Sequence, residues 1–176
     1  MDREIRIYPD EILRKRAEEV TEFNSELREL VDEMLAIVKE QRAYGLAANQ
    51  IGVLKRVFVL DVDSDGNRDG QKLVFINPEI IHAEGESVRE EGCLSLPGLW
   101  KKVKRAEKVR VKAQDVNGKE FILDAEGLLA RGIQHEIDHL DGVVFIDRLS
   151  PLQRRLALEK YKKLKKRYMK KTASGR

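Results

Sequence analysis

The stretch GIQHEIDHLDG, from Gly132 to Gly142, combines two histidines and an acid in the spacing H-E-x-x-H. Residues four apart on an α-helix lie about 40° apart around its axis, so His135 and His139 project from one face. Two such imidazoles can bind one metal ion, and Glu136 between them can reach a water beside it. A lone histidine is more often a surface or core residue than a ligand, but this pair on a predicted helix favours a metal site.

The third metal ligand is not given by this stretch, although catalytic metal centres usually have three protein ligands and an open position. Glu159 lies at a distance that suits a metalloprotease, but it stands in the run LEKYKKLKK, where a helical ion pair explains it. Cys93, in EEGCLSLPGLW, follows Gly92, and its thiolate suits Fe(II) or Zn(II). A free cysteine is as often a small buried residue, so the local sequence leaves its role open.

A third stretch, RAYGLAANQIG from Arg42 to Gly52, contains small residues and the amide side chain of Gln50. Helix termination and packing would explain the glycines and alanines. Gln50, however, offers a side-chain N–H donor beside a flexible backbone, which is the kind of group that stabilises a developing oxyanion.

The composition is that of one folded domain of 176 residues, with 41% apolar and 37% charged side chains. No apolar run approaches the roughly 20 residues that span a bilayer, so we expect no membrane association. The charged N-terminus lacks a secretory signal, and a single cysteine cannot form an internal disulfide. Both features predict a cytoplasmic protein.

Hydrophobic periodicity predicts an α+β fold with antiparallel β-sheets around the H-E-x-x-H helix. We expect an N-terminal helix from Ser25, as its N-cap, to Ala43, and a metal-binding helix from Ala125 to Leu140 that Asp124 caps. Ser150, Pro151 and Gln153 predict the start of a C-terminal helix. The strands are expected at Val57 to Val62, Leu73 to Ile80, and in a hairpin from Val109 to Leu123 that turns at Asn117-Gly118.

Together, three motifs resemble those of the peptide deformylases. That family is marked, in order, by G-x-G-x-A-A-x-Q, E-G-C-L-S and Q-H-E-x-D-H-L. Here the motifs read AYGLAANQ (Ala43 to Gln50), EGCLS (Glu91 to Ser95) and QHEIDHL (Gln134 to Leu140), and only Ala43 departs from the pattern. The resemblance covers the chain up to its tail, and three ordered motifs are far more specific than H-E-x-x-H alone.

The resemblance implies a hydrolase that removes the formyl group from the N-terminal formylmethionine of newly made proteins and releases formate. Cys93, His135 and His139 would hold one divalent metal ion, natively Fe²⁺, with Zn²⁺, Ni²⁺ or Co²⁺ as substitutes. Glu136 would be the general acid and base, and Gln50 with the backbone N–H of Leu94 would form the oxyanion site.

Residues around these would complete the site. Glu91 is the expected acceptor for the second nitrogen of a ligating histidine. Asp138 can pair with Arg105 or remain an ordinary solvent-facing acid. By the resemblance, the residues that bind the formylated peptide are Tyr44, Gly45, Gly92, Leu128, Arg131 and Gly132.

The tail is strongly basic. From Arg154 to Arg176 there are 11 Lys and Arg residues and one acid, whereas the rest of the chain has 23 bases and 30 acids. We assign residues 1–149 to the catalytic part and residues 150–176 to a basic C-terminal helix and tail of the same domain. Such asymmetry indicates a polyanionic partner.

Because deformylases act on chains emerging from the ribosome, we expect this helix to contact ribosomal RNA, with no DNA binding and a monomeric protein. Deleting the residues after Arg155 should then weaken ribosome binding and leave the turnover of short formyl peptides intact. Two alternatives remain at this stage: a zinc metalloprotease that uses Glu159 as third ligand, and an RNA-binding module with a structural metal.

Overall fold

The computed structural model describes residues 3–63, 65–67 and 72–174. Three α-helices within these ranges carry the architecture, namely α1 (Ser25–Gln41), α2 (Gly127–Leu140) and α3 (Pro151–Ser174). Short 3-10 helices occur at η1 (Glu11–Arg14), η2 (Ala48–Ile51) and η3 (Phe145–Arg148). The strands are β1 (Gly45–Ala47), β2 (Val57–Leu60), β3 (Leu73–Glu84), β4 (Ser87–Cys93), β5 (Leu96–Arg105), β6 (Lys108–Gln114) and β7 (Glu120–Glu126).

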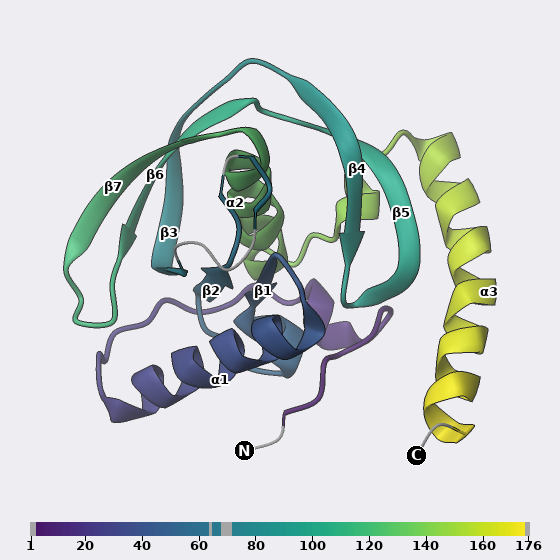
Figure 1. The fold of residues 1–176 in the computed structure, drawn as a ribbon, viewed down its shortest axis with the longest axis horizontal. Helices are drawn as coiled ribbons and strands as arrows, with labels where there is room; N and C mark the ends of the chain where they lie inside the picture. Colours follow the sequence, from purple (N-terminus) through teal and green to yellow (C-terminus); the bar gives the residue numbers. More distant parts are fainter. Residues whose placement is uncertain (1–2, 64, 68–71, 175–176) are drawn as a thin grey trace.

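All the strand pairs in the two sheets are antiparallel. One sheet has the order β1-β2-β3-β6-β7, and the other is the hairpin β4-β5. Figure 1 shows α2 between these two sheets, with α1 across the base of the molecule and α3 along β5. The predicted α+β architecture, with antiparallel sheets around the central H-E-x-x-H helix, is therefore confirmed.

Three apolar clusters hold the helices on the sheets. Phe58 and Phe75 stack with ring centroids 4.6 Å apart beneath the inner face of α2, where Ile133 and Leu140 are buried. A second cluster packs α1 on the strands β1 and β2. The third joins α3 to β5 and η3. The helix that carries both histidines is thus buried in the core and does not lie on the surface.

The start of α2 differs from the prediction. The helix begins at Gly127, not at Ala125, because the β6–β7 ladder continues as far as the pair Lys108 and Glu126. Asp124 therefore lies in a strand, where its carboxylate accepts a hydrogen bond from Arg110 Nε at 2.7 Å, and it does not cap the helix. Strand pairing outweighed the local capping signal.

Other boundaries also moved. The N-cap of α1 is Asn24, whose side chain accepts from the N–H of Leu27, and Ser25 is the first helical residue. The strand expected to reach Val62 ends at Leu60, and the next strand continues to Glu84. The predicted hairpin with its turn at Asn117-Gly118 is confirmed as β6–β7.

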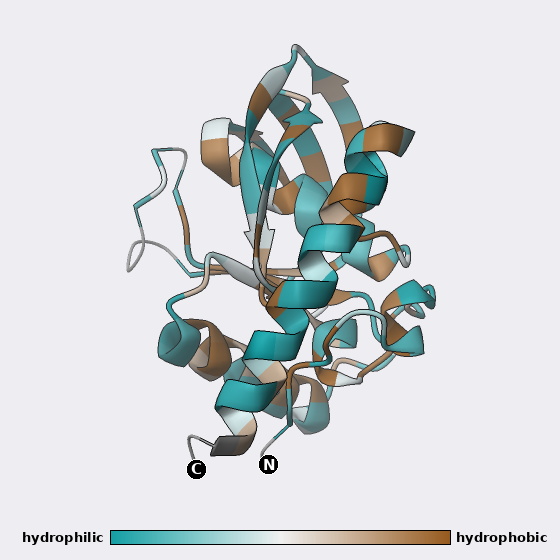
Figure 2. Ribbon diagram, turned by 90° about the vertical axis from the view of Figure 1, so that its right-hand side faces the viewer, coloured by the Kyte–Doolittle hydropathy of each residue, from teal (hydrophilic) through white to brown (hydrophobic). Residues whose placement is uncertain are grey.

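The C-terminal helix begins as its sequence predicts. Pro151 is its first residue, and the hydroxyl of Ser150 accepts from the N–H of Gln153 at 3.2 Å. Ala157 and Tyr161 face β5 and are buried, whereas the central turns of α3 are hydrophilic on the outside (Figure 2). Among the residues described, no helix combines the length and the apolar character that crossing a bilayer requires.

Candidate metal centre

A helix and a strand that are far apart in the sequence bring the three predicted ligands together. His135 and His139 project from α2, and Cys93 ends β4. His139 Nε2 lies 3.2 Å from His135 Nε2 and 3.3 Å from Cys93 Sγ, and the three ligand atoms all lie within 4.8 Å of one another. One thiolate and two imidazoles are the donors that Fe(II) and Zn(II) accept, and one divalent cation would engage all three. The residues therefore fit a metal ion.

Glu91 orients the first histidine. The Nδ1 of His135 is 2.8 Å from Glu91 Oε1, an arrangement in which Nδ1 donates and Nε2 is left to face the cluster. Burial alone would raise the pKa of this carboxyl, but hydrogen bonds from Arg105 and His135 hold the pKa of Glu91 well below its usual range. Glu91 stays ionised at neutral pH, which favours a single orientation of the imidazole.

Arginines surround this carboxylate. Arg105 donates to Glu91 through Nε at 2.8 Å and through a terminal nitrogen at 2.9 Å, and Arg131 donates at 2.5 Å. Arg105 also donates to Asp138 at 2.6 Å, so the predicted pairing of these two residues forms, and Arg148 contacts the same carboxylate. This buried network joins the hairpin β4–β5 to α2.

Glu136 faces the cavity beside the three ligands. Its side chain is buried, and desolvation raises the pKa of Glu136 to about 7. A Cβ atom on Gly45 would lie 2.9 Å from Glu136 Oε2 and 2.4 Å from Leu60 Cδ2. Only glycine leaves room here for the acid. A carboxyl group with a pKa near neutrality can both accept and donate a proton under physiological conditions.

Gln50 presents its amide N–H groups to the same place. Its Oε1 accepts from the N–H of Ala47 at 2.9 Å, which fixes the orientation of the amide. Its Nε2 therefore points to Ser95 Oγ at 3.1 Å and to Cys93 Sγ at 3.4 Å. Leu94 follows Cys93 in the turn of the hairpin and also lines the cavity.

A cavity of about 570 Å³ opens on these groups. Its lining contains all of the residues predicted to bind substrate, namely Tyr44, Gly45, Gly92, Leu128, Arg131 and Gly132. The lining also contains Trp100, together with Leu60, Val62 and Tyr168, which the prediction did not include. Leu60 lies in β2, Val62 follows that strand, and β5 and α3 contribute Trp100 and Tyr168, so packing of distant segments brings these residues to the cavity.

The side chain of Arg131 also belongs to the Glu91 network. It borders the cavity, but its guanidinium group donates to Glu91, to the carbonyl oxygen of Val103 and to Ser87. Burial lowers the pKa of Arg131, and the Glu91 carboxylate opposes that shift. The charge of Arg131 is thus paired with Glu91, while the residue borders the cavity as expected.

A buried acid and an amide donor that face one cavity, beside three residues that could hold a metal ion, are typical of a metal-dependent hydrolase. Residues 2–155 match the model of the polypeptide deformylase family. A peptide deformylase of Acidobacterium capsulatum is 54% identical over 166 residues, which cover 94% of this chain and 97% of that protein. A peptide deformylase of Thermodesulfovibrio yellowstonii is 52% identical over 159 residues, covering 90% and 96%.

The solved structures agree. The crystal structure of a peptide deformylase from Legionella pneumophila superposes with a TM-score of 0.88 at 46% identity, covering 96% of this chain and 98% of that one. The chain belongs to the polypeptide deformylase family, and it is an enzyme of that activity. The two alternatives are not supported: Glu159 is exposed on α3 and is not among the clustered ligand residues.

Proposed function

We propose that Cys93, His135 and His139 hold the metal ion on which deformylation depends, and that Glu136 moves the protons of the reaction. The observation that carries this proposal is the convergence of three ligand atoms within 4.8 Å beside a buried acid. When bound, a divalent ion supplies a Lewis acid that polarises the formyl carbonyl and lowers the pKa of water. As in the family, the products are formate and a peptide with a free amino terminus.

The side chains of this chain supply the remaining chemistry. Glu136 accepts a proton from the attacking water and returns it to the leaving amine. Gln50 Nε2 and the N–H of Leu94 donate hydrogen bonds to the oxyanion that forms at the formyl carbon. One such donor lowers the barrier by about 3 to 4 kcal/mol. The buried setting of Gln50 supports this role, because the amide is oriented before substrate arrives.

The substrate lies along the cavity as an extended chain. The backbones of Tyr44, Gly45 and Gly92 offer hydrogen bonds to such a peptide, as an added strand would receive. Leu128 and Gly132 border the methionine side chain. Gly92 supports this placement, because a Cβ atom there would lie 2.7 Å from the indole ring of Trp100, so only glycine keeps the backbone accessible beside that ring.

The native ion is Fe²⁺. The support for this assignment is the thiolate ligand, which iron accepts and which makes the site sensitive to oxygen. Protein purified without oxygen is expected to contain iron and to lose activity in air, and Zn²⁺, Ni²⁺ or Co²⁺ should occupy the site when supplied. Iron-free protein of equal activity from anaerobic cells would contradict this assignment.

Replacing Cys93 tests the ligand set. Cys93→Ala is expected to lose bound metal and formate release together, because only two protein ligands remain. Metal content, measured by mass spectrometry of the purified protein, gives a readout independent of turnover. Full metal content and activity in this variant would contradict the ligand set.

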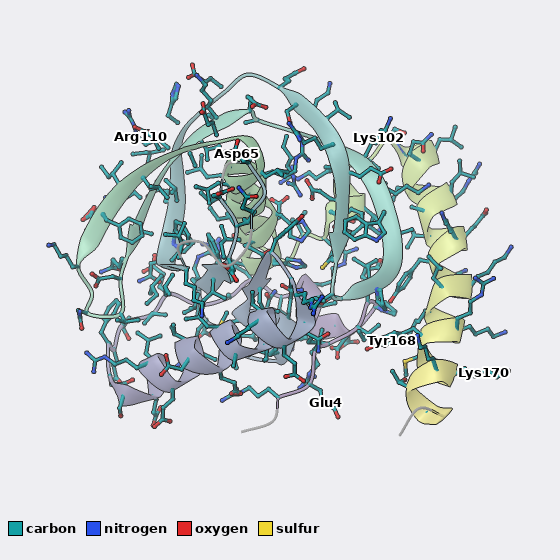
Figure 3. All side chains as sticks on the ribbon, in the orientation of Figure 1. Glu4, Asp65, Lys102, Arg110, Tyr168 and Lys170 are labelled. Carbon is teal, nitrogen blue, oxygen red and sulfur yellow. The ribbon has the colours of Figure 1, made fainter. Side chains whose placement is uncertain are left out.

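The basic helix α3 is proposed to dock the cytoplasmic, monomeric enzyme on ribosomal RNA. Lys162, Lys163 and Lys166 are exposed on it, and Figure 3 shows Lys170 on the side away from the domain. Each phosphate contact releases counterions, so binding should weaken steeply with salt.

Changing Lys162, Lys163 and Lys166 to Glu tests this docking without removing buried residues. The variant is expected to bind ribosomes at least about tenfold more weakly at low salt and to turn over formyl-Met-Ala-Ser normally. A control variant carries the same change at Lys15, Lys39 and Lys119, which are exposed elsewhere. Equal ribosome affinity of the two variants would contradict docking through α3.

A further inference from the structure

A short N-terminal segment connects the two halves of the proposed oxyanion site. The N–H of Arg6 donates to the carbonyl oxygen of Gln50 at 2.7 Å, and the N–H of Tyr8 donates to the carbonyl oxygen of Ser95 at 2.8 Å. Gln50 lies in η2, whereas Ser95 follows Cys93 and Leu94 in the hairpin turn. Residues 6–8 thus span from one motif to the other.

The same two motifs also touch directly. The amide nitrogen of Gln50 donates to Ser95 Oγ at 3.1 Å, and both residues are buried. With the bonds to Arg6 and Tyr8, this contact closes a ring of hydrogen bonds around the place where the two proposed donors meet. A change in the position of Tyr8 would therefore be transmitted to Ser95 and to the neighbouring Leu94.

Helix α3 holds this segment in place. The hydroxyl of Tyr161 donates to the carbonyl oxygen of Tyr8 at 2.8 Å, and the two rings meet edge to face with centroids 5.9 Å apart. Tyr161 is only 3% exposed. Arg14 fixes the other end of the Tyr8 side chain, donating to its hydroxyl at 3.1 Å.

We propose that Tyr161 is a positioning residue for deformylation, which holds Tyr8 and thereby sets the distance between the Cys93–Ser95 turn and Gln50. This inference rests on the proposed roles of Gln50 and Leu94. The two donors act together only if both reach the same oxyanion, and small misplacements of such groups reduce the rate strongly. The C-terminal helix therefore contributes to catalysis through one hydroxyl group, apart from any contact it makes outside the domain.

The variant Tyr161→Phe isolates that hydroxyl, because it keeps the ring and its packing. We expect kcat for formyl-Met-Ala-Ser to fall roughly tenfold while KM changes by less than about twofold, the pattern of an interaction made in the transition state. The matched control is Ser150→Ala, which removes a hydrogen bond at the start of the same helix and leaves the N-terminal segment untouched. The control should lower Tm and retain kcat.

A double-mutant cycle with Ser95→Ala shows whether the effect passes through the ring of hydrogen bonds. If it does, Tyr161→Phe lowers kcat much less in the Ser95→Ala background than in the wild type, because the two changes are coupled. Unchanged kcat in Tyr161→Phe, or independent effects that multiply in the double variant, would overturn the inference. The variant Gln50→Ala distinguishes failure of this inference from failure of the proposed oxyanion site. If Gln50→Ala lowers kcat but Tyr161→Phe does not, only the positioning role of Tyr161 is wrong. If Gln50→Ala keeps full kcat, the proposed oxyanion role of Gln50 is wrong as well.

Discussion

At the scale of single residues, Glu91 has the densest set of charged contacts at the site. It is 5% exposed and bonds to His135, Arg105 and Arg131. Its carboxylate therefore stabilises the fold and also orients His135, the proposed metal ligand. Removing one partner of a buried charge network leaves the other charges without a counter-ion. This destabilises the folded protein more than replacing the whole network by apolar side chains would.

The variant Glu91→Gln removes this charge and keeps the size of the side chain. This change should lower the free energy of unfolding by about 3 to 5 kcal/mol, because two buried guanidinium groups lose their anion. Metal affinity should fall roughly 10- to 100-fold, because His135 loses its ionised acceptor. Urea unfolding of the metal-free protein and metal titration measure the two effects separately. The exposed Glu86→Gln serves as control, and wild-type stability in Glu91→Gln would refute the argument.

Individual residues show how far the sequence predicts a site. The spacing of His135 and His139 places them on one helix face from local geometry alone. Cys93 needed the family motifs, since a single cysteine has no periodicity. Ser95 and Tyr161 were not assigned to the site, because their contacts with Gln50 and Tyr8 exist only after distant segments have packed.

At the scale of elements, the hairpin β4–β5 was the main feature without a sequence signal. Strand β4 has mostly exposed or half-buried side chains, so it lacks the alternation of apolar and polar residues that marks a half-buried strand. The one buried side chain of this strand is the charged Glu91, which pairs with the arginines of the network. Because this buried position is charged rather than apolar, the sequence of β4 lacks the pattern by which a strand is predicted.

Helix α3 provides the prediction at this scale. Deleting residues 156–176 removes the buried Ala157 and Tyr161 and exposes the apolar face of β5 beneath them. We expect a loss of roughly 3 kcal/mol or more in the free energy of unfolding, together with reduced turnover. This revises the expectation that such a deletion spares activity.

A shorter deletion, of residues 170–176, is the control, because it keeps the buried stripe. Thermal and urea unfolding of both forms check the comparison. Equal stability of the two truncated proteins would contradict the assignment of α3 to the core.

At the scale of the whole molecule, ion pairs join η1, η3 and α3. Asp147 accepts from Arg14 and from Arg154 and also from the N–H of Val144. Burial alone would raise the pKa of Asp147, but these partners, Arg14 foremost, lower it below its usual range. The folded state therefore favours the ionised form.

The lowered pKa of Asp147 determines how the stability of the protein depends on pH. An aspartate with a lowered folded pKa stabilises the protein above its unfolded pKa of about 4, and this stabilisation is lost as the pH falls through the folded pKa. Asp147→Asn should therefore be less stable than wild type at pH 7, with the difference shrinking below about pH 4. Urea unfolding at several pH values measures this. A difference that grows on acidification would contradict the pairing.

The central claim is that a metal site with Glu136 as proton carrier removes the formyl group. The most direct measurement is formate release from formyl-Met-Ala-Ser by anaerobically purified wild type and by Glu136→Gln with equal metal content. The account predicts formate release by the wild type and a loss of at least about 100-fold in kcat for the variant, because general acid-base catalysis typically contributes at least that much. Full activity of metal-loaded Glu136→Gln would contradict it.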